Sequence, residues 1–315
     1  MKRCAKCNNL MPGDAMQCIR CGFDSTPRDF VKGPVKAGKI ANGFALAVQS
    51  WRVLMMDKEL LVFPLLSGLA CFLVLASFAG FGYLTGMRVR DPEHIEAAQW
   101  FFLFLYYFCN YFVIVFFNVA LIACAMIRFR GGNPTVRDGL AAARERLGLI
   151  AAWAALAATV GVVLRMIEER VGFVGKIVVL ILGAVWTIAT FFVVPVLVVE
   201  NLGPVEAAKR SVEIVRKAWG EAIVSNIGIG LLTFLAMLLV VVPFAVLMAV
   251  IALKAGSIAI AVIGAVLTIA LVVTIQLASS ALTSILLSAL YLYATGGQVP
   301  AGFDPARLKA AFVAK

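Results

Sequence analysis

Six stretches of this chain run for about eighteen residues or more without a charged side chain. They cover Leu60–Leu84, a run within Ala97–Ile127, Leu147–Leu164, Ile177–Val199, Ala222–Leu253 and Ser257–Tyr293. A helix needs about 20 apolar residues to cross about 30 Å of hydrocarbon. The composition agrees, because 63% of the residues are hydrophobic and 14% are charged, which leaves too little polar surface for a soluble protein. We therefore predict an all-α integral membrane protein with six transmembrane helices.

Positive charges are unevenly distributed around these runs. Six spans place both termini on one side, where the connecting segments hold 22 of the 28 Lys and Arg residues, against 6 on the other side. Positively charged loops tend to stay in the cytoplasm, so we predict a cytoplasmic (inner) membrane location with both termini cytoplasmic. The net charge of +11 then follows from topology and from attraction to membrane lipids, and no nucleic-acid partner is expected.

The last run is too long for an upright span. Its 37 residues would reach about 55 Å as one helix, so it must tilt, break or project. A hydroxyl-rich stretch, Ser279–Ser284, lies in its second half. Such side chains can bond a neighbouring helix or relieve freed backbone groups, but packing through small residues is the simpler interpretation.

A candidate amphipathic helix precedes each pair of spans. These helices cover Ile40–Leu60, Thr135–Leu147 and Pro204–Gly220, and the apolar members predicted for the first are Phe44, Val48, Trp51, Val53 and Leu54. Helices of this kind can lie in the membrane interface. Ala47–Arg52 loosely resembles Ala208–Glu213, so the architecture reads as three units of interfacial helix plus hairpin. The units could enclose a cavity open to lipid or substrate, or simply anchor helices at the headgroups.

Two Cys-x-x-Cys pairs stand near the beginning of the chain, separated by ten residues. They are Cys4, Cys7, Cys18 and Cys21. Four thiolates at this spacing suit one tetrahedral, structural Zn²⁺, and Gly22 and Asn8 suit the tight turns after each pair. We predict a zinc ribbon over residues 1–26, a linker over 27–39, the membrane domain over 40–300 and a cytoplasmic tail over 301–315.

Two alternatives to the zinc ribbon are open. The cysteines could form a reduced tail without metal. Disulfides are less expected, because no apolar signal segment precedes the cysteines, and a cytoplasmic location keeps thiols reduced.

Two segments carry a resemblance to known families. Pro195–Ser211, followed by Trp219, resembles a recurring signature of bacterial multi-span families of uncharacterised function, among them proteins similar to the membrane domain that accompanies some glycerophosphodiester phosphodiesterases. Ser50–Leu66 resembles one such uncharacterised family more closely, and the likeness covers most of residues 35–300. The resemblance implies no catalytic residues, and the chain carries no phosphodiesterase catalytic domain.

Candidates for chemistry are few. His94 lies among carboxylates in a loop between spans, where a metal is conceivable but a solvated loop is the simpler interpretation. Glu168 and Glu169 lie between two arginines and are interpreted as interface charges. No metalloprotease motif, phosphate-binding glycine loop or nucleophile elbow occurs in the sequence.

Polar residues within the spans are candidates for lining a path. They are Asn110, Asn118, Asn226 and Gln276, although hydrogen bonds between helices explain them more simply. Cys71, Cys109 and Cys124 are interpreted as packing residues. Pro64, Pro195 and Pro243 are predicted to mark helix ends or kinks.

Three functional hypotheses follow. We favour a non-enzymatic inner-membrane protein whose zinc ribbon is a docking or regulatory module and whose bundle engages membrane lipids or a membrane or cytoplasmic protein partner. The alternative is a transporter or lipid-moving permease, which the absence of charged residues within the runs disfavours. A membrane enzyme ranks last, because the sequence offers no recognisable catalytic constellation.

Overall fold

The structure is a computed structural model that describes residues 2–3, 10–11, 39–85, 97–217 and 221–310. The chain divides into two compact units, residues 1–36 and 37–315. In the first, strands β1 (Lys2–Arg3) and β2 (Leu10–Met11) pair antiparallel, with Lys2 opposite Met11. The four cysteines of the predicted zinc ribbon and the predicted linker up to residue 38 lie outside the described residues.

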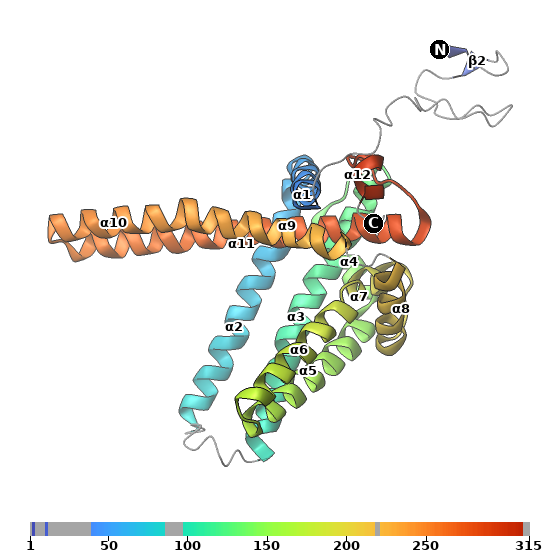
Figure 1. Cartoon of the computed structure of the whole chain (residues 1–315). Helices are drawn as coiled ribbons and strands as arrows, with labels where there is room; N and C mark the ends of the chain where they lie inside the picture. Colours follow the sequence, from blue (N-terminus) through green and yellow to red (C-terminus); the bar gives the residue numbers. More distant parts are fainter. Residues whose placement is uncertain (1, 4–9, 12–38, 86–96, 218–220, 311–315) are drawn as a thin grey trace. The chain divides into compact units, whose positions relative to one another are not determined.

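The second unit is helical (Figure 1). Its elements are α1 (Lys39–Met56), the short helix η2 (Lys58–Leu61), α2 (Val62–Leu84), α3 (Ala97–Phe129), α4 (Val136–Glu145), α5 (Leu147–Arg170), α6 (Phe173–Ala189), α7 (Val193–Val199), α8 (Pro204–Lys217), α9 (Glu221–Ala236), the π-helix η3 (Met237–Val241), α10 (Val242–Ala255), α11 (Ile258–Gly296) and α12 (Pro305–Ala310).

The predicted spans are present in the described chain. Six helical segments are long and apolar enough to cross a membrane: Lys58–Leu84, Ala97–Phe129, Leu147–Arg170, Gly175–Val199, Ile229–Ala255 and Ile258–Gly296. The second unit is therefore all-helical, and its six long apolar helices support the prediction of a multi-pass membrane protein. Helices α1, α4 and α8 stand before successive pairs of spans, in the order that the sequence predicts.

Prolines mark the irregular points of the spans. Pro195 lies in the first turn of α7, directly after the break that separates α7 from α6, and Pro243 follows the π-helix η3 at the beginning of α10. Proline is tolerated in a first turn because the N–H that it lacks would have no helical partner there. The sixth span does not break: α11 is one helix of 39 residues, about 58 Å long, and it projects beyond the protein core.

The core lies at one end of the spans. The buried residues of α3 lie between Val115 and Phe129, and those of α11, apart from Gly264, lie between Ala281 and Tyr291. Helices α1, α4, α7 and α8 contribute to the same apolar cluster. Because α1 precedes the first span and both α3 and α11 end here, this is the end that the predicted topology assigns to the termini.

Helix α1 has two apolar faces rather than one. It packs against α9 and α11, so Val53 and Leu54 are buried, whereas Phe44 and Trp51 are half exposed. After α11, Phe303 packs edge-on against Phe129 of α3, and Leu308 of α12 is fully buried. The first ten residues of the predicted tail therefore fold back against the helices.

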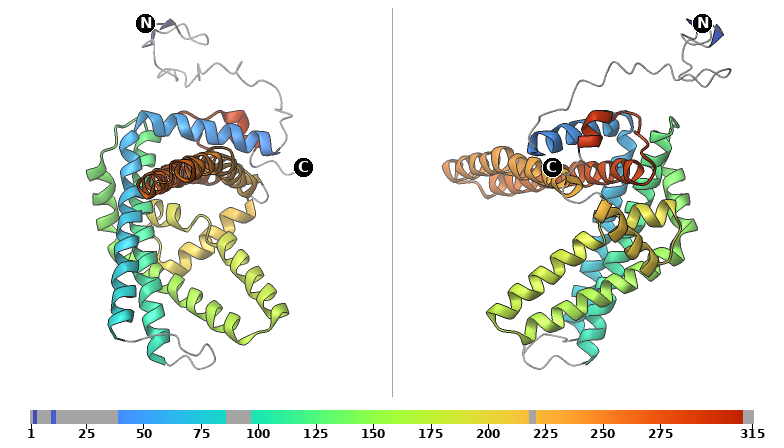
Figure 2. Two further views of the ribbon diagram at one scale, coloured as in Figure 1. Left: turned by 90° about the vertical axis from the view of Figure 1, so that its left-hand side faces the viewer. Right: turned by 45° about the vertical axis from the view of Figure 1, so that its right-hand side comes forward.

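Two groups of spans run in different directions. Helix α2 packs against α3, α3 against α5 and α5 against α6, and Figures 1 and 2 show the hairpin of α10 and α11 running crosswise to these four helices. The hairpin is held together by close contact, since a Cβ on Gly264 would come within 2.9 Å of Met248 Cβ. Its two helices turn at Gly256, whose φ of 58° is the left-handed region that glycine adopts readily.

Candidate functional site

An ion pair joins two turns of the chain, the elbow between α1 and α2 and the elbow between α3 and α4. Asp57 stands between α1 and α2, and Arg128 lies in the last turn of α3. Arg128 donates from Nε to Asp57 Oδ2 and from Nη2 to Oδ1, and Nη2 also donates to Asn133 Oδ1 at 2.8 Å. The Asp57 side chain is only 7% exposed. A bidentate pair satisfies a carboxylate that burial would otherwise penalise, so this contact fixes the α1–α2 elbow to the end of α3.

The neighbouring helix α4 is fixed at its beginning. Thr135 and Asp138 form a capping box, in which Asp138 N donates to Thr135 Oγ1 at 3.3 Å and Thr135 N donates to Asp138 Oδ2 at 2.9 Å. Hydrogen bonds from the Thr135 hydroxyl and backbone lower the pKa of Asp138. Cys124 Sγ of α3 donates to Thr135 O at 3.4 Å, which places the cap against the core.

Gly139 allows α4 to approach α3 closely. A Cβ at this position would come within 2.8 Å of both Ala120 O and Cys124 Sγ. Any side chain would therefore push α4 away from α3. The buried Cys124 acts here as a packing residue, as the sequence predicts.

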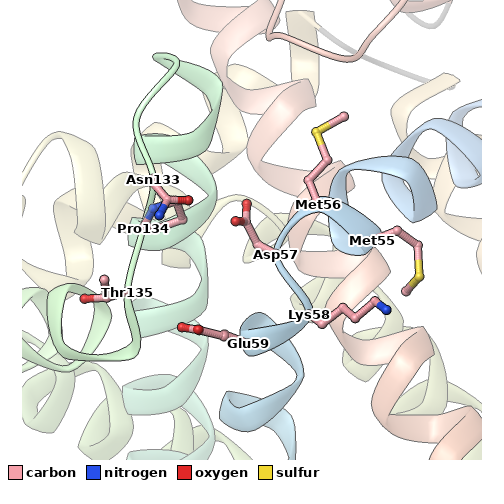
Figure 3. A pocket seen from close by; sticks show the side chains of 8 residues that line it. All are labelled: Met55, Met56, Asp57, Lys58, Glu59, Asn133, Pro134 and Thr135. Atoms are coloured by element: carbon pink, nitrogen blue, oxygen red, sulfur yellow. The ribbon is translucent and has the colours of Figure 1, made fainter.

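A pocket opens between these two elbows (Figure 3). Its volume is about 380 Å³, and it is lined by Met55, Met56, Asp57, Lys58, Glu59, Asn133, Pro134 and Thr135. Lys58 and Glu59 are exposed and form no ion pair with a residue in the described ranges. Figure 3 shows the Glu59 carboxylate on the side of Thr135 and Lys58 extending to the opposite side. The pocket thus offers one free charge of each sign.

A second polar cluster ties together the ends of α7, α8 and α11. Glu200 follows α7 and accepts hydrogen bonds from Arg210 Nε at 3.0 Å and from the Tyr291 hydroxyl at 2.7 Å. Arg210 also pairs with Glu213. Hydrogen bonds to Glu200 and then to Glu213 raise the pKa of Arg210, so Arg210 stays protonated. These part-buried hydrogen bonds hold the ends of the three helices together.

The break between α6 and α7 has its own polar partner. Ser211 of α8 is fully buried, and its Oγ accepts a hydrogen bond from Phe192 N at 2.9 Å. This bond satisfies a backbone donor in the irregular turn between the two helices. The related serine of the proposed repeat, Ser50 of α1, is also fully buried but donates to Leu46 O within its own helix at 3.0 Å. The two serines therefore share burial but not partners.

Comparison with known families places the chain. The model of a protein family described as "Family of unknown function (DUF6159)" matches residues 97–303, which is more than half of the chain. The chain belongs to the DUF6159 family. This membership confirms the resemblance to an uncharacterised family, whereas the likeness to a phosphodiesterase-associated membrane domain stays a prediction. A search of curated proteins returned no match.

The structure places most of the other predicted residues apart from one another. His94 and the four cysteines that are predicted to bind zinc lie outside the described residues, and in the described ranges no three His, Cys, Asp or Glu side chains gather as a metal site. Glu168 and Glu169 pair with Arg165 on the surface of α5, as expected for interface charges.

The polar residues of the spans do not converge. Asn110 Nδ2 donates to Tyr106 O of its own helix at 2.9 Å, and Gln276 is exposed. Asn118 is half-buried, and the side chain of Asn226 lies outside the described part. The hydroxyl-rich stretch does link helices, since Ser279 Oγ and Thr233 Oγ1 are 2.7 Å apart.

Sequence reasoning missed the two ion-paired clusters. Asp57 and Glu200 each stand at the boundary of a span, so they resemble ordinary interface charges in the sequence. For Glu200 a usable signal is that this acid directly follows a long apolar run, because a charge at that depth needs a partner. Asp57 gives no such signal, since Lys58 and Glu59 separate it from its run. The partner itself depends on tertiary structure.

Proposed function

We propose that this DUF6159 protein is a non-enzymatic protein of the cytoplasmic membrane whose helical bundle engages membrane lipid or a membrane partner, and whose N-terminal zinc ribbon is a docking or regulatory module. One observation carries the proposal. The spans are buried in protein at the end where α3 and α11 finish, which we call the packed end, and elsewhere they expose apolar side chains. Two acids at the packed end, Asp57 and Glu200, are used to join helices. Large apolar side chains such as Phe72 and Leu267 are exposed elsewhere, where lipid or a membrane partner must cover them.

The proposed orientation places both termini in the cytoplasm. The excess of Lys and Arg on the terminal side supports it. A membrane-impermeant maleimide tests it on intact spheroplasts, with Ser257→Cys at the tip of the α10–α11 hairpin and Lys309→Cys in α12 as the matched opposite. We expect labelling of Ser257→Cys above the wild-type background and none of Lys309→Cys until the membrane is opened. Labelling of Lys309→Cys in intact spheroplasts would reverse the orientation.

Zinc binding by Cys4, Cys7, Cys18 and Cys21 is the second part of the proposal. The pairing of Arg3 in β1 with Leu10 in β2 supports it, because these two residues flank Cys4 and Cys7 in the sequence. Strand pairing next to a Cys-x-x-Cys pair suits a closed tetrahedral site, whose role is structural.

Native mass spectrometry of the full chain in mild detergent tests the proposal directly. We expect one zinc ion on the wild type, none on Cys18→Ser, and one on the control Cys71→Ser, which changes a half-buried cysteine of α2. A protein partner lost together with zinc supports docking through the ribbon. A wild type without zinc refutes the ribbon, and a partner kept by Cys18→Ser refutes its docking role. A bundle that retains neither lipid nor protein refutes the lipid- or partner-engaging role.

The alternative, a transporter or lipid-moving permease, would use the repeated hairpins around a central path. The outward position of Gln276 and the local bond of Asn110 give it no support. Substrate-dependent flux in proteoliposomes is the observation that would favour it.

A further inference from the structure

We propose that the pocket between the α1–α2 elbow and the α3–α4 loop binds the headgroup of a phospholipid that carries a primary ammonium, the phosphoethanolamine class, through Glu59 and Lys58. The inference rests on the proposed function, because it names the class of lipid that the bundle engages.

The first argument is the depth of the pocket in the membrane. Met55–Glu59 directly precede or begin the first span, and Asn133–Thr135 follow the end of the second. The ends of spans lie where the hydrocarbon meets the headgroups. The pocket is therefore at headgroup level, and the exposed Leu65 and Leu69 of α2 lie one to three turns further into the hydrocarbon, where acyl chains run.

The second argument is the balance of charge. Asp57 lines the pocket, but Arg128 neutralises it. This leaves Glu59 and Lys58 as the lining charges without an ion-pair partner in the described chain. One free anion and one free cation match a zwitterion, whereas a purely anionic headgroup would face the Glu59 carboxylate and a bare cation would face Lys58.

The third argument is hydrogen bonding. A primary ammonium donates three hydrogen bonds, and a carboxylate such as Glu59 accepts them. A choline headgroup carries methyl groups instead and donates none. Lys58 then takes the phosphate as a flexible point charge. Recognition by Glu59 should therefore distinguish phosphoethanolamine from phosphocholine, whereas Lys58 should bind the phosphate of both headgroups.

The fourth argument is shape. A volume of about 380 Å³ lies within the range of small-molecule sites, roughly 300–1,000 Å³. Met55 and Met56 border the charged groups, and the unbranched thioether side chain of methionine adapts to irregular apolar surfaces. The pocket thus joins a polar centre to an apolar rim, as a lipid headgroup and its glycerol require.

Native mass spectrometry with matched lipids tests the inference. The full chain in mild detergent is offered equal amounts of dioleoyl phosphatidylethanolamine, phosphatidylcholine and phosphatidylglycerol. We expect the ethanolamine lipid to be retained about 1.5- to fivefold more than the choline lipid, the range of an exposed ion pair. Glu59→Gln should remove that preference, Lys58→Gln should lower retention of both lipids, and the control Glu206→Gln, an exposed acid of α8, should change neither.

A methylation series supplies a second measurement on the unaltered protein. Retention should fall stepwise from phosphatidylethanolamine through its N-methyl and N,N-dimethyl forms to phosphatidylcholine, because each methyl group removes a donor. Equal retention along the series overturns the inference, and so does a preference that survives Glu59→Gln. Unselective retention overturns the inference and leaves the proposed function intact, whereas absence of any retained lipid or protein partner removes both.

Discussion

The second half of α3 and the α10–α11 hairpin are both strongly apolar, yet their surroundings differ completely. Val119, Leu121 and Cys124 of α3 are fully buried, whereas Leu253 and Ile258 at the tip of the hairpin are more than 80% exposed. Hydropathy reports only that a segment avoids water. It does not distinguish a helix that is covered by protein from one that must be covered by lipid.

Side-chain size does not separate the two regions. The buried half of α3 contains Ala120, Ala123 and Ala125, and small residues let helices approach closely in a membrane. The exposed part of α11 carries small residues too, such as Ala259 and Ala261, beside branched aliphatic residues such as Val262 and Ile269. Whether protein or lipid covers an apolar run therefore depends on tertiary structure and not on residue size alone.

The largest effect is expected from breaking the ion pair beside the buried half of α3. Arg128→Gln leaves the buried Asp57 carboxylate without its partner, so it should lower the free energy of unfolding by about 3–5 kcal/mol. Asp57→Asn should cost less, because the Arg128 side chain that it leaves unpaired is 21% exposed. Thermal unfolding in detergent, followed by circular dichroism, measures the loss. The matched control is Glu169→Gln, which removes an exposed ion pair of α5 and should cost at most about 0.5 kcal/mol. Equal effects would contradict a special role for the packed end.

A pair of isoleucines on one helix sharpens the comparison. Ile285 of α11 is fully buried and Ile269 is 62% exposed. Ile285→Ala should cost about 2–4 kcal/mol, because it leaves a cavity in the core, whereas Ile269→Ala should cost at most about 0.5 kcal/mol. The same unfolding measurement compares the two. A large cost at Ile269 would mean that another part of the protein covers the hairpin.

The sequence predicts the membrane class, the six spans and the three helices before them, because these depend on local apolarity and charge. Pro195 and Pro243 likewise predict irregular backbone, since proline acts through its own ring. The sequence does not predict that Asp57 meets Arg128, or that Glu200 meets Tyr291, because these pairs join residues 71 and 91 positions apart. For α1, periodicity locates apolar residues, but the neighbours α9 and α11 decide that Leu54 is buried and Trp51 is not.

A smaller effect should follow from changing the glycine that seats α4 on α3. Gly139→Ala introduces a methyl group within 2.8 Å of Ala120 O, and overpacking of this kind typically costs about 1–3 kcal/mol. The control is Gly148→Ala in α5, where a Cβ meets nothing within 4 Å and should be neutral or slightly stabilising. Thermal midpoints of the two variants compare them. No loss for Gly139→Ala would mean that α4 can move away from α3 freely.

The smallest effect should come from the capping box of the same helix. Thr135→Ala removes the N-cap and should cost about 1 kcal/mol at neutral pH. Thr135 also lowers the pKa of Asp138 in the folded protein, so the ionised carboxylate stabilises α4. That contribution is complete above the ordinary aspartate pKa of about 3.9 and is lost as the pH falls through the lowered value. The difference in thermal midpoint between wild type and Thr135→Ala should therefore be constant from pH 7 to 5 and shrink below pH 4. A difference that stays constant to pH 3 would show that the hydroxyl caps α4 without help from Asp138, and that the exposed surface of this helix contributes little to the stability of the packed end.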